Sequence, residues 1–170
     1  MSLDKEVLFN LLKNFDEEAK EKITLVAVGG TAMTLLDLKV STLDIDFTVP
    51  RSDKPEFDRV RNSVPHGFKI DVYTDGVVFC TTLPDDYIDR SSEIRNFNRI
   101  LLRALHPVDI VVTKIGRLSD RDIQDIEACI SRCNIKKEEI MARATNIIYV
   151  GREEDYPYNL QWVMENLYPH

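Results

Sequence analysis

The sequence predicts a domain of mixed helix and strand structure, in the α/β (α+β) class. Up to about residue 105, short apolar runs of strand length alternate with segments whose apolar residues recur at helical spacing. From Pro107 onward the periodicity is helical throughout, so we expect a helical carboxy-terminal part. At 170 residues the chain is long enough for a single domain with a sizeable core.

Composition and charge exclude several classes of protein. Hydrophobic residues make up 44% and charged residues 30%, which is ordinary for a globular domain, and no apolar run approaches the roughly 20 residues that span a bilayer. Asp4, Lys5 and Glu6 stand where a signal peptide would need apolar residues, so we expect a cytoplasmic protein with no membrane partner. A net charge of −7 favours a small, metal-chelated anionic substrate over a long polyanion.

The first elements in chain order are a helix, a buried strand and a short helix. Apolar residues recur at helical spacing over residues 3–21, with charged residues on the other face. Residues 23–28 form a continuous apolar run that ends at a glycine pair, which is typical of a central strand. A short helix over residues 31–38 follows, with its apolar residues turned inward.

The middle of the chain continues the alternation of strands and helices. Residues 44–49 and 68–73 alternate polar and apolar side chains and predict strands, with a helix over residues 54–64 between them. Asp75-Gly76 lies between two β-rich runs, which predicts a hairpin to a strand over residues 77–81.

The second half of the chain begins with residues 82–98, which are polar and irregular and predict a surface segment. The elements expected after it are a strand over 99–105, a helix over 107–118, a helix that starts at Ser119, and two further helices over 135–150 and 155–167.

The glycine pair Gly29-Gly30 is the first candidate binding feature. Glycine allows the backbone to come close to a ligand, and the following helix offers unpaired N–H groups to an anion. Taken alone, the pair is better explained by a tight strand-to-helix turn without a ligand, because Gly-Gly pairs are common. Thirteen residues separate Gly30 from the second feature, Asp44-Ile45-Asp46-Phe47.

The acidic residues of two predicted strands form the second feature. Asp44 and Asp46 point to the same face of their strand, about 7 Å apart, so both carboxylates can reach one small metal cluster. Asp71 faces away from the apolar residues of the next predicted strand. If the two strands are neighbours, a three-carboxylate cluster results, and hard cations such as magnesium accept carboxylate and phosphate oxygens.

Two further residues have a functional and a structural interpretation. Lys114 lies among apolar neighbours on its predicted helix, where it either neutralises phosphate charge or packs as a long aliphatic side chain. Asp122 stands three residues after Ser119 in a pattern that resembles a capping box, and local capping is a sufficient explanation for it.

Taken together, these motifs resemble the signature of the nucleotidyltransferase superfamily. Val28-Gly29-Gly30 and Asp44-Ile45-Asp46-Phe47 match that signature, with a spacer at its long end. Gly29-Gly30-Thr31-Ala32, the run from Ser41 to Phe47, and His106-Pro107-Val108-Asp109 followed by Lys114 and Arg121-Asp122 are most similar to the AbiEii/MenT-type toxin–antitoxin nucleotidyltransferases and related uncharacterised prokaryotic proteins.

The resemblance implies a nucleotidyltransferase fold, a mixed β-sheet flanked by helices. It places the core at about residues 22–130 and leaves a helical carboxy-terminal extension at about 131–170. It also implies transfer of a nucleoside monophosphate from a nucleoside triphosphate to a hydroxyl acceptor, with two divalent ions, magnesium or manganese. The acceptor stays open between RNA, a protein and a small molecule, and a toxin–antitoxin partner is implied as well.

The resemblance also gives roles to individual residues. The metal ligands would be Asp44, Asp46 and Asp71, the last also helping to activate the attacking hydroxyl. The triphosphate would be held by Gly29, Gly30, Thr31 and Thr42. Lys114 and Asp122 match positions that act in some relatives, the first in catalysis and the second in nucleotide binding.

Two other functions compete with this interpretation. Asp44-Ile45-Asp46-Phe47-Thr48 also spells the nucleophile motif of haloacid-dehalogenase-like phosphatases, but the strand before it is not strongly apolar and the glycine pair has no role in that chemistry. A nucleotide-binding or antitoxin-like protein with slow or no catalysis is the other alternative. It would bind nucleotide with metal and form no product.

Overall fold

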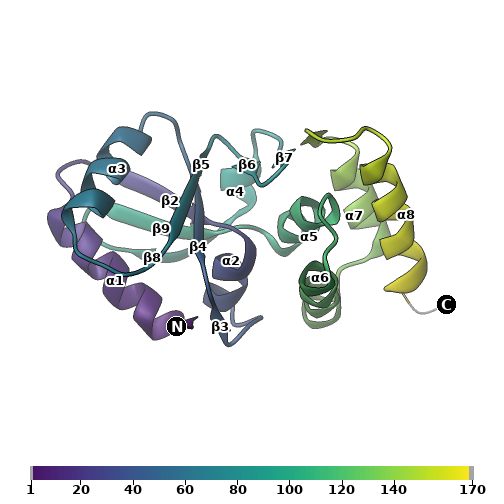
Figure 1. Cartoon of the computed structure of the whole chain (residues 1–170), viewed down its shortest axis with the longest axis horizontal. Helices are drawn as coiled ribbons and strands as arrows, with labels where there is room; N and C mark the ends of the chain where they lie inside the picture. The colour runs from purple at the N-terminus through teal and green to yellow at the C-terminus, as the bar shows by residue number, and fades with distance from the viewer. Residues whose placement is uncertain (1, 169–170) are drawn as a thin grey trace.

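A computed structural model describes residues 2–168, and its centre is a mixed five-stranded sheet with helices packed on both faces (Figure 1). The described residues form eight helices: α1 (Lys5–Glu18), α2 (Gly29–Leu35), α3 (Lys54–Ser63), α4 (Tyr87–Arg90), α5 (Pro107–Ile115), α6 (Asp120–Cys133), α7 (Lys137–Ala144) and α8 (Asp155–Asn166). The strands are β1 (Leu3–Asp4), β2 (Ile23–Ala27), β3 (Ser41–Thr42), β4 (Ile45–Val49), β5 (Ile70–Thr74), β6 (Val77–Val78), β7 (Thr81–Thr82), β8 (Ser92–Asn96), β9 (Ile100–Ala104) and β10 (Ile148–Tyr149).

The main sheet has the spatial order β5-β4-β2-β9-β8. Strand β2 runs parallel to β9 and antiparallel to β4, while β4 runs parallel to β5. The mixed sheet flanked by helices, implied by the resemblance, is confirmed. The parallel pair β4–β5 is essential for the site, because it brings two acidic strands together at one edge of the sheet.

Side chains along β4 point alternately into the core and toward a pocket at the β4–β5 edge of the sheet. Phe47 packs edge-on against Phe57 of α3, and Phe57 packs edge-on against Phe15 of α1. All three rings are almost completely buried. Since side chains alternate along a strand, the packing of Phe47 into the core turns its neighbour Asp46 to the opposite face.

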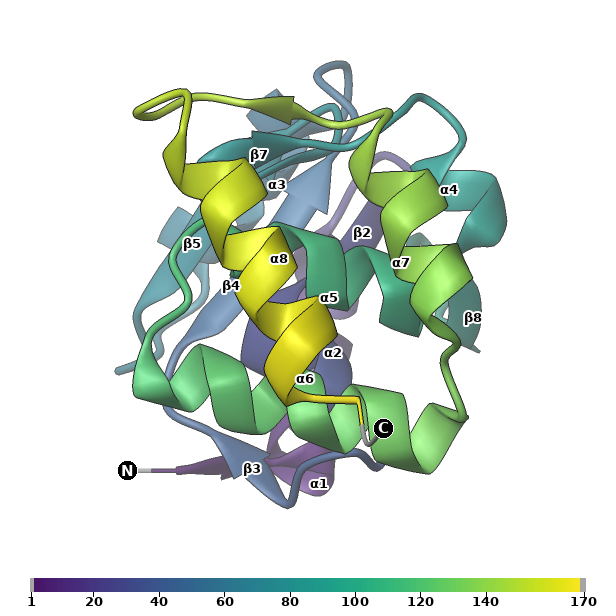
Figure 2. The same ribbon diagram turned by 90° about the vertical axis from the view of Figure 1, so that its right-hand side faces the viewer.

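The last four helices, α5 to α8, form a group beside the sheet, at the right of Figure 1. Helix α5 is at its centre and contacts α6, α7 and α8. Figure 2 looks directly onto this group, with α8 in yellow in front of α5. The boundary expected near residue 131 falls inside α6. No helix in residues 2–168 has the length and apolar composition that crossing a bilayer requires.

The Asp75-Gly76 turn exists, but the predicted hairpin is wrong. Both residues have positive φ, 53° and 83°, as the sequence signal requires. However, Asp75 N–H donates to the Val49 carbonyl and Gly76 N–H to the Thr48 hydroxyl, which ties the turn to the end of β4. Strand β6 therefore leaves the main sheet and pairs with β7 and, through it, with β10.

Two regions differ from expectation because their strands bury few side chains. The predicted surface segment 82–98 contains α4 and the edge strand β8, whose residues are mostly exposed and so show no apolar alternation. The predicted helix over 135–150 stops at Ala144, and the chain then pairs as β10 with β7. In both regions backbone pairing, which leaves little trace in the sequence, decides the structure.

Candidate active site

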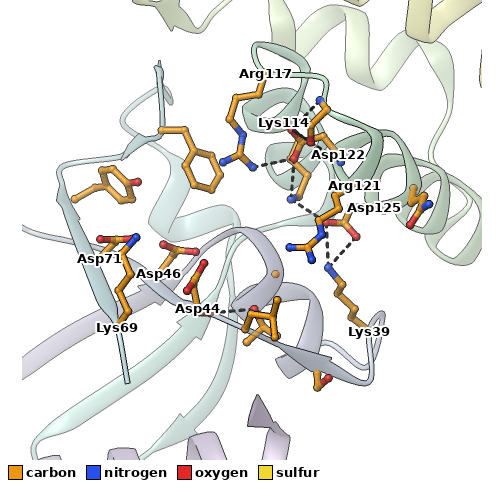
Figure 3. Close-up of a pocket in the computed structure, with 18 residues that line it drawn as sticks. Lys39, Asp44, Asp46, Lys69, Asp71, Lys114, Arg117, Arg121, Asp122 and Asp125 are labelled. Carbon is orange, nitrogen blue, oxygen red and sulfur yellow. Dashed lines mark hydrogen bonds and ion pairs between the residues drawn. The ribbon is translucent and has the colours of Figure 1, made fainter. Parts of the chain in front are cut away.

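A pocket of about 630 Å³ lies between the β4–β5 edge of the sheet and helices α5 and α6 (Figure 3). Its charged lining residues are Asp44, Asp46, Asp71, Lys39, Lys69, Lys114, Arg117, Arg121, Asp122 and Asp125. Asp44, Asp46 and Asp71 lie together on the sheet side, and we call them the acidic wall. Lys39, Lys114, Arg117 and Arg121 face them across the pocket together with Asp122 and Asp125, and this second group is called the basic wall.

The acidic wall depends on the register of two parallel strands. Asp46 of β4 is directly opposite Asp71 of β5, so the two side chains emerge side by side on the same face. Asp44 lies in the bend just before β4 and is exposed, whereas Asp46 is buried. The expectation that Asp71 would come from the neighbouring strand with matching orientation is confirmed.

The glycine pair lies directly behind the acidic wall. Gly29 has a φ of +54°, and a Cβ on it would lie 3.3 Å from Cζ of Phe79 and 3.7 Å from Oδ2 of Asp46. A Cβ on Gly30 would lie only 2.8 Å from the Thr42 hydroxyl. Both positions therefore require glycine, the first for its backbone conformation and the second for space.

We expect Gly29→Ala to destabilise the protein by about 1–2 kcal/mol, because alanine resists a left-handed conformation and its methyl group would crowd Phe79. The measurement is thermal unfolding followed by circular dichroism. The matched control is Gly67→Ala, where a Cβ would meet no atom within 4 Å. Equal melting temperatures for the two variants would show that the turn is not constrained in this way.

Two threonines hold the backbone of the acidic segment in place. The Thr31 hydroxyl accepts a hydrogen bond from Asp46 N–H at 3.0 Å and lies 3.2 Å from the Asp44 carbonyl, to which it donates. The Thr42 hydroxyl donates to the same carbonyl at 2.9 Å. Thr31 is completely buried, so its side chain supports the acidic wall and is not available for the triphosphate contact that the resemblance implies. Thr42 lines the pocket.

Lys114 is buried, and its charge is compensated by two carboxylates. Its Nζ lies 3.0 Å from Asp125 and 3.4 Å from Asp122. Asp125 also pairs with Lys39 at 3.1 Å. These contacts favour a packed, ion-paired lysine over a cation that is presented to phosphate.

Asp122 is at the centre of a local network. It accepts from Ser119 N–H at 3.1 Å and from the Ser119 hydroxyl at 2.9 Å, which confirms the capping box, and from Arg117 at 2.8 Å. Burial opposes its charged form, but the hydrogen bond from Arg117 and the charges of Lys114 and Arg117 outweigh it and lower the pKa of Asp122. Both oxygens of Asp122 are thus engaged within the protein, and the nucleotide contact that the resemblance implies for it stays a prediction.

The carboxylates of the acidic wall repel one another. Burial first, and then the charges of Asp71 and Asp44, raise the pKa of Asp46 from 3.8 to about 6. An arrangement that makes a buried carboxylate harder to ionise is common in sites that bind a cation or perform acid–base chemistry.

The donor set fits magnesium in part. Hard oxygen ligands suit this ion, which is usually bound by one or two carboxylates together with substrate phosphates, and the adjacent Asp46 and Asp71 supply two. Within residues 2–168, no three carboxylate, imidazole or thiol groups are gathered closely enough to hold one ion by themselves. The three-carboxylate cluster expected from the sequence is therefore not preformed.

Sequence reasoning missed the prominence of three residues in this pocket. Arg117 and Arg121 both line it, and within the described chain Arg121 forms no ion pair with an acidic residue. Phe79, in the turn between β6 and β7, lies against Gly29 and beneath Arg117. Helical spacing within the predicted helix over 107–118 could have shown that Arg117 faces the same way as Lys114. Nothing in the sequence indicates the places of Arg121, which lies on the next helix, and of Phe79.

Comparison with known proteins agrees with the fold. The crystal structure of ANT(2")-Ia in complex with adenylyl-2"-tobramycin has a similar fold, with a TM-score of 0.56 and 13% sequence identity, over 82% of this chain and 94% of that chain. Curated proteins gave no match. Residues 6–167 match the family described as nucleotidyltransferase of unknown function (DUF6036), nearly the whole chain. The chain therefore belongs to the DUF6036 family of nucleotidyltransferases.

Proposed function

We propose that this protein transfers a nucleoside monophosphate from a nucleoside triphosphate to a hydroxyl acceptor, with divalent metal ions. The observation that carries the proposal is the in-register pair Asp46 and Asp71, which faces a basic wall across one pocket and has the glycine turn behind it. Family membership and the shared fold with ANT(2")-Ia support the same reaction class.

The acidic wall would hold the metal ions. Asp46 and Asp71 would be the inner ligands and Asp44 would join them from the bend before β4, while substrate phosphates would complete the set. Magnesium bound there would neutralise charge on the triphosphate and make the attacking hydroxyl easier to deprotonate. We assign the contact with the acceptor hydroxyl to Asp71, because it is on the edge strand and 39% exposed.

The basic wall would hold the triphosphate. Arg117 and Arg121 present guanidinium groups to the pocket, and such groups bind phosphate oxygens in pairs. A buried ion-pair network supports Arg117 and fixes the wall; it consists of Lys114, Asp122 and Asp125. Gly30 and Thr42 also line the pocket. A triphosphate held by this wall would present its reactive phosphorus to the carboxylates.

Transfer with magnesium or manganese is tested with each of the four common ribonucleoside triphosphates, labelled at the α-phosphate and incubated with fractions of cell extract. We expect label on an acceptor with the wild type, loss of label with Asp71→Asn, and retention with Asp89→Asn, an exposed aspartate on α4. RNA, protein and small-molecule acceptors, and a toxin–antitoxin partner, are distinguished by the fraction that is labelled. Metal-dependent nucleotide binding without any labelled product would contradict the proposal and support the nucleotide-binding alternative.

A further inference from the structure

The turn between β6 and β7 places an aromatic residue in a backbone conformation that aromatic residues rarely adopt. Val78 pairs with Thr81, so Phe79 and Cys80 form the two-residue turn. Phe79 has a φ of +54°, a left-handed value that favours glycine. A strained non-glycine residue of this kind often marks a functional position when the surrounding structure holds it in place.

The ring of Phe79 is held by three neighbours that line or support the pocket. Its tip, Cζ, would lie 3.3 Å from a Cβ on Gly29, so the ring rests directly on the glycine turn. Tyr73 of β5 packs edge-on at 5.9 Å between ring centroids. The guanidinium carbon of Arg117 lies 3.7 Å from the ring centroid, which is a close cation–π contact.

Arg117 is thereby fixed from two directions. The Phe79 ring supports one face of its guanidinium, and Asp122 accepts a hydrogen bond from one end at 2.8 Å. Within residues 2–168, Asp122 is the single acceptor that Arg117 contacts, although arginine carries five N–H donors. The Arg117 side chain is 43% exposed, in contrast to the buried and paired Lys114. Figure 3 shows its guanidinium directed across the pocket toward the acidic wall.

We propose that Phe79 is a positioning residue, which holds the Arg117 guanidinium above the glycine turn so that its remaining donors meet the phosphates of a nucleoside triphosphate. This inference rests on the proposed function. An aliphatic side chain at position 79 would fill the same space but would not align the planar guanidinium of Arg117. The close position of the guanidinium over the ring, together with the strained backbone at Phe79, points to alignment of Arg117.

Two replacements separate alignment from packing. Phe79→Leu keeps an apolar side chain and removes the aromatic face, and 3,5-difluorophenylalanine keeps the shape and weakens the attraction for a cation. Tyrosine is unsuitable, because a hydroxyl on Cζ would meet Gly29. The matched control is Phe9→Leu, since Phe9 stacks on Arg95 at 4.0 Å on another part of the protein.

The readouts are calorimetric binding of ATP and of inorganic triphosphate with magnesium, and KM and kcat where transfer is detected. We expect Phe79→Leu to weaken triphosphate binding and raise KM about 3- to 30-fold, the range of one cation–π contact, and the difluoro replacement to have a smaller effect in the same direction. In an Arg117→Gln background, Phe79→Leu should cause no further loss. Phe9→Leu should leave triphosphate binding unchanged.

The outcomes distinguish this inference from the proposed function. Unchanged triphosphate binding by Phe79→Leu, or an equal loss in the Arg117→Gln background, would overturn the positioning role alone. If the wild type binds triphosphate with the expected dependence on Phe79 but transfers nothing, the inference stands and the proposed reaction fails. A wild type that binds no triphosphate would contradict both.

Discussion

Asp46→Asn is expected to abolish nucleotidyl transfer and, in the absence of metal, to make the protein more stable. Asp46 is buried beside two other carboxylates, and its pKa of about 6 in place of 3.8 corresponds to a cost of up to about 3 kcal/mol for keeping it ionised. Asparagine has nearly the same shape and carries no charge, so it removes that repulsion. The melting temperature should rise by roughly 4–10 °C at pH 8 in EDTA.

The stabilisation by Asp46→Asn should depend on pH with a defined sign. The unfolded chain releases this proton near pH 3.8, and the folded protein retains it up to about pH 6. The folded wild type therefore loses stability as the pH rises through this interval. The advantage of the asparagine variant should be absent near pH 4 and complete above about pH 7.

Loss of activity in Asp46→Asn follows from loss of an inner metal ligand. Removing several kcal/mol of charge stabilisation from the transition state lowers the rate by roughly 10²–10⁴-fold. Melting curves with and without magnesium provide an independent readout, because magnesium should stabilise the wild type and not the variant. The control is Asp44→Asn, which alters an exposed carboxylate and should change the metal-free stability little. A variant that is active, or less stable than wild type at pH 8 in EDTA, would contradict the assignment of Asp46.

The second large effect is expected for Arg143→Met, far from the pocket. Arg143 of α7 donates two hydrogen bonds, at 2.6 and 3.0 Å, to Asp109 of α5, which is completely buried. It also pairs with Asp86 at 2.9 Å. Removing the arginine leaves a buried carboxylate whose nearest remaining cation is Arg90, at 3.8 Å. We expect a loss of about 3–5 kcal/mol.

Thermal and urea unfolding measure this loss, which should lower the melting temperature by roughly 6–15 °C. Arg152→Met is the control, because Arg152 is 72% exposed and its pairs with Glu154 and Asp155 should contribute less than about 1 kcal/mol. Adding Asp109→Leu to Arg143→Met should restore part of the stability, since both charges are then absent. No recovery in the double variant would indicate that the pair is needed for helix packing beyond its charges.

The sequence was most informative where the same local contact or the same buried face determines both the residue pattern and the structure. Alternation along β4 and β5 predicts the common orientation of Asp46 and Asp71, because burial of Phe47 and its neighbours fixes the register. The capping box at Ser119 is predicted from two residues three apart, because both partners are local.

The sequence was least informative where contacting residues are far apart in the chain, or where hydrogen bonds between main chains determine the structure. β8 and β10 are held by hydrogen bonds between main chains and bury few side chains, so neither leaves a periodic pattern. Phe79 reaches the pocket because the Asp75-Gly76 turn is tied to β4 and not to a hairpin partner. The pairing of Lys114 with Asp125 depends on how α5 packs against α6. The spacing of apolar residues within each helix does not specify this packing.

The hydroxyl of Thr31 joins the two motifs that stand thirteen residues apart in the sequence. It belongs to the helix that begins at the glycine pair, yet it bonds to the main chain on both sides of Ile45. These hydrogen bonds fix helix α2 and the acidic segment relative to each other. We therefore expect phosphate held at the glycine turn and cations held by the carboxylates to bind cooperatively. Thermodynamic linkage then requires each ligand to raise the affinity for the other by the same factor.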